Sequence, residues 1–206
     1  MRTLVIDSAT EACSVALFDG NEMLAGELRV LGRGHAEQLV PMIAALPGKG
    51  KAGRIAVALG PGSFTGVRVG IAAARALAFA WQAELRGYPT LDLIAAMARG
   101  ERGAEPVGVA TPGGHGEWFV QNFDSAGRAA RPLASLKPEA AAQAAEAHFI
   151  AGAAAQALVD LRGRGEALAV LPDARAFALL PPTSLTAGVH PLYGRAPDAR
   201  LPAKAG

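Results

Sequence analysis

The chain has 206 residues, of which 51% are hydrophobic and 18% are charged, and its formal net charge is +2. This length and apolar content suit one large domain or two small lobes with a true core, and they exclude a wholly disordered chain. The basic residues are scattered without interleaved aromatics, so the composition does not indicate a nucleic-acid-binding protein.

The start of the chain indicates a cytoplasmic protein. Met1 and Arg2 lead directly into a β-rich run that reaches Asp7, and no secretory signal pattern is present. The longest apolar stretch, residues 67–81, contains two arginines and is shorter than a membrane-spanning helix. The single cysteine, Cys13, excludes an internal disulfide. We therefore expect a cytoplasmic location and no contact with a membrane.

The first half of the chain predicts strands followed by alternating helices and strands. Short runs that alternate apolar and polar residues, or that are rich in β-branched residues, indicate strands at residues 3–6, 13–18, 22–30, 55–59 and 86–89. Apolar residues at helical spacing indicate helices at residues 35–46, 67–84 and 91–99. Pro41 lies inside the first of these helices and should kink it, because proline removes a backbone donor.

The second half repeats this order more weakly. Expected strands are residues 106–110, 117–123, 131–136, 149–151 and 168–171. Expected helices are residues 138–148, 153–162 and 173–180. Strands mixed with crossover helices predict an α/β fold with mixed sheets in two lobes, residues 1–100 and 101–206. The shorter connections indicate that the second lobe, with its proline-rich tail, is a reduced copy of the first.

The strongest local signal is the glycine-rich segment 60–66, which lies between a buried strand and a helix. Glycines permit close backbone approach, and a helix N-terminus offers free N–H groups, so the segment could hold a phosphate. A purely structural turn, capped by Ser63 or Thr65, explains the pattern equally well. With the first strand turn, the candidate phosphate- or nucleotide-facing residues are Asp7, Ser8, Thr10, Gly60, Gly62, Ser63, Thr65 and Gly66.

The other chemically capable residues do not form a recognised catalytic set. The four histidines share no spacing typical of a zinc site, and no nucleophile-elbow motif is present. Cys13 lies in a β run, where a buried inert thiol is the better interpretation. We therefore expect neither a metal site nor a catalytic residue.

Comparing the two halves argues against an active phosphotransferase. In two-lobed phosphotransferases of the actin-like type, each lobe supplies an acid from its first strand turn to hold a magnesium nucleotide. Asp7 fills this place in the first lobe, but residues 111–115 of the second lobe contain no carboxylate. Without Mg²⁺, phosphoryl transfer loses its main electrostatic support.

The helix expected at residues 67–84 is apolar nearly all round. Such a helix is buried on most sides, either as a central core helix or by packing against another subunit. The composition of the helix does not distinguish between these two alternatives.

Four segments resemble the TsaB (YeaZ) family. They are residues 1–17, 35–43 with the internal Pro41, 57–70 and 191–199. The resemblance covers the first hundred residues well and the second lobe weakly until the tail. It implies an actin/Hsp70-like (ASKHA) fold of two lobes, the second one reduced.

The resemblance also implies a function. Members of this family act in the synthesis of N6-threonylcarbamoyladenosine beside the anticodon of ANN-decoding tRNAs. The implied role is that of a non-catalytic partner, a pseudoenzyme that forms a heterodimer with the transferase TsaD. The resemblance further implies docking of the ATPase TsaE, a homodimer when TsaD is absent, and contact with tRNA only through the complex. No intrinsic cofactor is expected, and ATP or ADP would bind at the junction with TsaD.

The resemblance assigns the partner interface to the two long helices of the first lobe. The expected interface residues are His35, Leu39, Val40, Met42, Ile43, Leu46, Val69, Ala72, Ala73 and Ala76. The metal-binding histidines of TsaD would fall near residues 88–96, which contain no histidine. In the second lobe, residues 112–114 replace an Asp-Ala-Arg triplet of the family, which puts a ligand role of that lobe in doubt.

Two alternatives to the partner role remain at this point. Asp7 and the glycine-rich segment would also suit an actin-like small-molecule kinase or ATPase. A protease is the third hypothesis, since relatives have carried a glycoprotease label, and it requires bound zinc.

Overall fold

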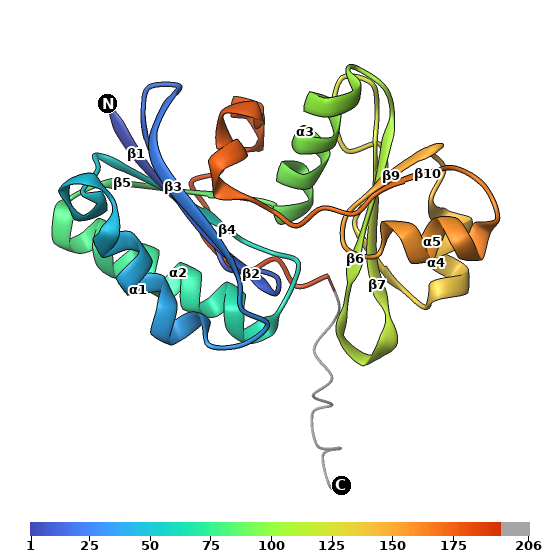
Figure 1. The fold of residues 1–206 in the computed structure, drawn as a ribbon, viewed down its shortest axis with the longest axis horizontal. Helices are drawn as coiled ribbons and strands as arrows, with labels where there is room; N and C mark the ends of the chain where they lie inside the picture. Colours follow the sequence, from blue (N-terminus) through green and yellow to red (C-terminus); the bar gives the residue numbers. More distant parts are fainter. Residues whose placement is uncertain (195–206) are drawn as a thin grey trace, which may run out of the picture.

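In the computed structural model, which describes residues 1–194, the chain forms two lobes that lie side by side (Figure 1). Each lobe contains a five-stranded mixed sheet with helices packed on it. This confirms the predicted α/β fold with two mixed sheets. Residues 195–199 of the tail motif lie outside the described part of the chain.

The sheet of the first lobe has the strand order β3-β2-β1-β4-β5. Strands β1, β2 and β3 pair antiparallel, whereas β4 and β5 continue the sheet parallel to β1. Both β1 and β2 are almost fully buried, in keeping with their apolar residues. The strands are β1 (Arg2–Asp7), β2 (Ala12–Asp19), β3 (Glu22–Val30), β4 (Arg54–Ala58) and β5 (Glu84–Tyr88).

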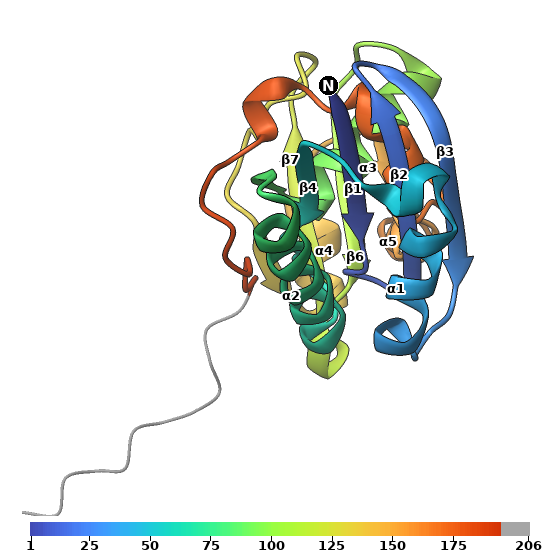
Figure 2. The same ribbon diagram turned by 90° about the vertical axis from the view of Figure 1, so that its left-hand side faces the viewer.

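Helices α1 (His35–Ala45) and α2 (Phe64–Trp81) lie next to each other over this sheet (Figure 2). Helix α1 continues through Pro41, which is exposed on the outer side of the helix. By length and composition alone α2 could cross a membrane, so the expectation that the stretch is too short was wrong. In this structure α2 packs on β4, and 33% of the helix is buried.

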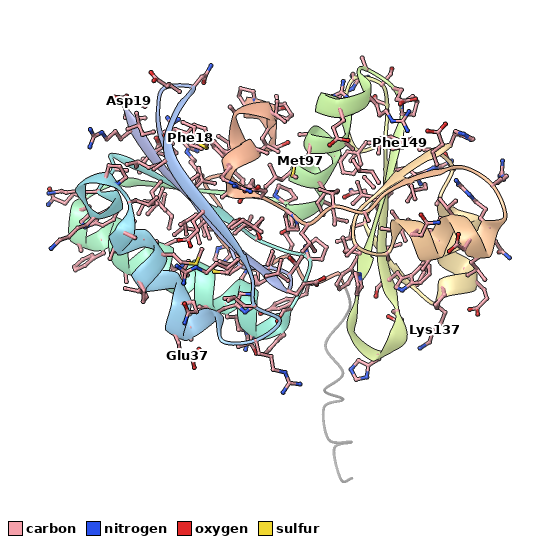
Figure 3. The ribbon with its side chains drawn as sticks, viewed as in Figure 1. Phe18, Asp19, Glu37, Met97, Lys137 and Phe149 are labelled. Atoms are coloured by element: carbon pink, nitrogen blue, oxygen red, sulfur yellow. The ribbon has the colours of Figure 1, made fainter. Side chains whose placement is uncertain are left out.

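Helix α3 (Thr90–Arg102) lies between the two sheets (Figure 1). Leu93 and Ala96 pack into the core of the first lobe, while Leu91 and Ile94 pack into that of the second. Figure 3 shows Met97 of α3 between the lobes. The helix therefore joins the two cores.

The second lobe repeats the connectivity of the first, with the strand order β10-β9-β6-β7-β8. Its central strand β6 pairs antiparallel with β7 and parallel with β9, as β1 does with β2 and β4. The outer elements are shorter, which confirms a reduced copy. The elements are β6 (Val107–Pro112), β7 (Trp118–Phe123), β8 (Ala134–Leu136), α4 (Pro138–Ala144), β9 (Phe149–Ala151), α5 (Ala155–Arg162) and β10 (Glu166–Leu168).

After β10 the chain returns to the first lobe. The 3₁₀ helix η3 (Ala174–Leu179) forms where an α-helix was expected over residues 173–180, and a second 3₁₀ helix, η4 (Pro182–Ser184), follows it. Phe177 packs against Phe18 and Tyr88, with ring centroids 5.8 and 6.0 Å apart. Residues 173–192 thus contact the first lobe, although the expected division at residue 100 placed them with the second.

Candidate functional site

The glycine-rich segment packs tightly on the turn that follows β1. A Cβ atom at Gly62 would lie 1.9 Å from the carbonyl oxygen of Ala9, and one at Gly66 would lie 2.1 Å from that of Ser8. The Ser8 hydroxyl donates a 2.9 Å hydrogen bond to the carbonyl of Gly66. These glycines are therefore required for packing, whether or not a phosphate binds nearby.

The start of α2 is capped from within the chain. Ser63 is the N-cap, and its hydroxyl accepts a 3.2 Å hydrogen bond from the backbone N–H of Gly66. The N–H of Ser63 donates to the Ala9 carbonyl, at 2.6 Å. Two N–H groups that a phosphate could have used already have partners, which favours the structural interpretation of this turn.

Asp7 is 1% exposed and lies below the surface. Its carboxylate accepts hydrogen bonds from the N–H of Ala9, at 3.0 Å, and from the Tyr88 hydroxyl, at 3.3 Å. Burial raises the pKa of Asp7 to about 7, against the effect of both hydrogen bonds. Burial, followed by the nearby Asp7 charge, also raises the pKa of Tyr88 well above its usual value. Asp7 therefore stabilises the turn through these hydrogen bonds and does not face solvent.

A cleft of about 750 Å³ opens between the lobes, next to this turn. We call it the interlobe cleft. Its first-lobe wall and tail wall consist of Ala9, Thr10, Glu11, Gly32, Gly62, Ser63, Phe64, Val67, Arg68, Leu192, Tyr193 and Gly194. Its second-lobe wall consists of Pro112, Gly113, Gly114, His115 and Phe119.

The cleft contains three of the eight residues expected to face a phosphate or nucleotide, namely Thr10, Gly62 and Ser63. The other five are placed elsewhere. Asp7, Ser8, Gly60 and Gly66 are buried, and Thr65 is exposed on the first turn of α2.

Three residues that were not predicted as site residues form one corner of the cleft. The Arg68 guanidinium stacks on the Phe64 ring at 3.6 Å, and its Nε and Nη2 atoms donate to the Tyr193 hydroxyl at 3.2 and 2.9 Å. The rings of Phe64 and Tyr193 lie 6.0 Å apart. Tyr193 is 125 residues from Arg68 in sequence, so only the resemblance of residues 191–193 to the family tail pointed to it.

Half of the expected interface residues are buried inside the chain. These side chains are at most 7% exposed, and they are His35, Leu39, Met42, Ile43 and Leu46. They form the inner side of α1, which packs on the sheet. These five side chains face the sheet inside the chain, and their place in a partner interface stays a prediction. Val69 and Ala73 are half-buried, while Val40, Ala72 and Ala76 are exposed.

The outer side of α1 and α2 nevertheless exposes apolar residues, next to the charged Glu37 and Arg75. Val40 is 57% exposed and Phe79 is 89% exposed. Small alanines surround them at helical spacing. We call this surface the α1/α2 face, and its members are Ala36, Val40, Ala44, Ala72, Ala76 and Phe79.

Within residues 1–194, no three or more His, Cys, Asp or Glu side chains are grouped so that they could hold a metal ion. His35 is buried, with Nε2 3.3 Å from the carbonyl of Ala12. Cys13 is also buried, and burial raises the pKa of its thiol to about 11. A thiol with this pKa is a weak nucleophile at neutral pH.

Comparison with known proteins places the chain in a family. The family model described as TsaD, tRNA N6-adenosine threonylcarbamoyltransferase, matches residues 29–167. The tRNA threonylcarbamoyladenosine biosynthesis protein TsaB of Escherichia coli is 37% identical over 148 residues, 68% of this chain and 64% of that protein. TsaB of Haemophilus influenzae is 41% identical over 98 residues, 45% of this chain and 40% of that protein. These matches span less than two thirds of the curated relatives' length.

Solved structures extend the similarity to nearly the whole chain. YeaZ from Pseudomonas aeruginosa has a TM-score of 0.77 and 31% identity, and the match covers 93% of this chain and 99% of that one. The ethanolamine utilization protein EutJ from Carboxydothermus hydrogenoformans shares the fold at 12% identity, with a TM-score of 0.53 and coverage of 88% and 90%. The chain therefore belongs to the TsaB (YeaZ) family and has its two-lobed actin-like fold.

Proposed function

We propose that this chain is a non-catalytic partner of the threonylcarbamoyltransferase TsaD in the N6-threonylcarbamoyladenosine modification of ANN-decoding tRNAs. The names of its TsaB relatives support a role in this pathway. The match to the TsaD family model supports pairing with TsaD, because related chains of one fold often associate through equivalent surfaces.

The observation that carries this proposal is the exposed α1/α2 face. A phenyl ring that is 89% exposed, as Phe79 is, leaves its apolar surface in water. Clustered apolar residues at the surface of a protein are typical of sites that bind other proteins. The alanines beside Phe79 allow the backbone of a partner helix to approach closely.

Two features support the absence of intrinsic catalysis. The second-lobe wall of the interlobe cleft contains proline, glycine, histidine and phenylalanine but no carboxylate among the described residues. Asp7, the acid that an actin-like phosphotransferase would use, is buried and hydrogen bonded to Tyr88. A kinase or ATPase of this fold needs a carboxylate from each lobe that faces the nucleotide and its metal, whereas among the described cleft residues only Glu11 of the first lobe carries one.

The remaining parts of the assembly are also proposals. We expect the α1/α2 face to form a homodimer when TsaD is absent. TsaE, with ATP or ADP, would bind at the junction with TsaD, and tRNA would contact the chain only through the complex. These steps would take place in the cytoplasm.

Substitution on the α1/α2 face tests the proposal. We expect Ala76→Glu to weaken binding to purified TsaD at least tenfold, because the interface would bury an unpaired charge. Ala157→Glu is the matched control, since Ala157 is an exposed alanine on the corresponding helix α5. The measurement is the dissociation constant by calorimetry, followed by a tRNA modification assay. Equal affinity of the two variants would contradict the proposal.

A further inference from the structure

The interlobe cleft has the size and lining of a small-molecule site. Its volume of about 750 Å³ lies within the range of ligand pockets. Most of its exposed surface is apolar, and Val67, Phe119 and Leu192 contribute to it. An apolar cleft of this kind gains free energy when a ligand displaces its water.

The aromatic corner of the cleft provides open ring surface. Phe64 is 58% exposed and Tyr193 is 52% exposed, although both contact Arg68. Their planes differ by 30°, so the two rings diverge only modestly. Flat aromatic molecules stack on such rings and on guanidinium planes.

Arg68 adds a positive charge to this corner. Two of its N–H groups donate to the Tyr193 hydroxyl, and no carboxylate of residues 1–194 lies within ion-pair distance of its guanidinium. The guanidinium thus keeps donors for an anion while its plane is fixed by Phe64. Glu11 also lines the cleft and repels anions, so it favours binding of the charged group at the Arg68 end.

We propose that the interlobe cleft binds a flat aromatic ligand that carries an anionic group, without a metal ion. The ring stacks between the apolar wall and the side chains of Phe64 and Tyr193. The anionic group pairs with Arg68. Among the described residues, the second-lobe wall has no carboxylate of the kind that a magnesium nucleotide would need, so we assign recognition of the anionic group to Arg68 of the first lobe.

Calorimetry on the isolated full-length chain tests this inference, and its outcome does not depend on TsaD. The probes are 2-naphthoate, which has a ring and a charge, 2-naphthamide, which has the ring alone, and inorganic phosphate. We expect 2-naphthoate to bind at least tenfold more tightly than 2-naphthamide, with or without EDTA, and phosphate not to bind. Equal affinities for the two naphthalenes, or no binding of either at about 1 mM, would overturn the proposal.

Two variants test whether Arg68 and Phe64 cause the binding of 2-naphthoate. Arg68→Gln should remove the preference for 2-naphthoate, and Phe64→Ala should weaken both naphthalenes. Arg75→Gln is the matched control, because Arg75 lies on the same helix but donates to the Val189 carbonyl outside the cleft lining. A preference that persists in Arg68→Gln, or that Arg75→Gln abolishes equally, would contradict the assigned role of Arg68.

Discussion

For Asp7, the structure decides between two interpretations of the same residue. An acid at the end of a first strand suggests either a ligand-facing group or a turn aspartate that accepts backbone N–H bonds. Here the carboxyl is buried, receives the N–H of Ala9 and the Tyr88 hydroxyl, and has a pKa of about 7. Folding therefore favours the protonated carboxyl, because the folded-state pKa lies above the unfolded value of 3.8.

This shift predicts that the chain loses stability as pH rises. Burying the charged Asp7 carboxylate lowers the free energy of unfolding. This loss is absent below pH 4, grows between pH 4 and pH 7, and reaches its full value of ~4 kcal/mol above pH 7. Asp7→Asn should remove this part of the pH dependence. Urea unfolding at pH 5 and pH 8 measures the difference, and an unchanged difference in the variant would refute the assignment.

The close approach of Gly66 to the first strand turn predicts a second effect at the residue scale. Gly66→Ala should lower the melting temperature, because its Cβ would lie 2.1 Å from the Ser8 carbonyl oxygen. The clash, ~3 kcal/mol, outweighs the gain of ~1 kcal/mol in helix propensity. Gly114→Ala is the control, since nothing lies within 4 Å of its Cβ position. Similar melting temperatures of both variants would contradict this prediction.

At the scale of elements, local pattern predicted most strands and helices but not their partners. The β runs and the stripe of α1 are local features, so β1, β2, β3 and α1 agree with the expected ranges to within about two residues. The apolar stripe of α1 did not show whether its residues pack in the core or at a partner interface, because apolar side chains are expected in both places. Leu39, for example, is buried in the core. Exposed Phe79 became a docking candidate only when the packing of α2 was known.

The 3₁₀ helix η3 illustrates contacts that sequence could not predict. Phe177 packs on Phe18 and Tyr88, which lie more than eighty residues away along the chain. We expect Phe177→Ala to lower the free energy of unfolding by ~2–3 kcal/mol, because it leaves a cavity over the first sheet. Leu179→Ala, at a side chain that is 51% exposed, should cost less than ~1 kcal/mol. Urea unfolding of both variants checks this, and equal losses would contradict it.

At the scale of the whole molecule, two lobes of one connectivity have different surfaces. Both sheets place their first strand in the centre, and α4 and α5 correspond to α1 and α2. The first lobe exposes the apolar α1/α2 face, whereas α5 presents the polar Gln156 and Asp160, joined by a 2.8 Å hydrogen bond. The repeat was visible in the sequence, but this difference in surfaces required the fold.

Hydrogen–deuterium exchange of the chain with and without TsaD tests the central claim most directly. We predict slower exchange in α1 and α2, residues 35–45 and 64–81, because docking covers their outer side. Helices α4 and α5 should exchange at the same rate in both samples. Protection confined to the second lobe, or no protection of α2 in a complex that has formed, would contradict the account.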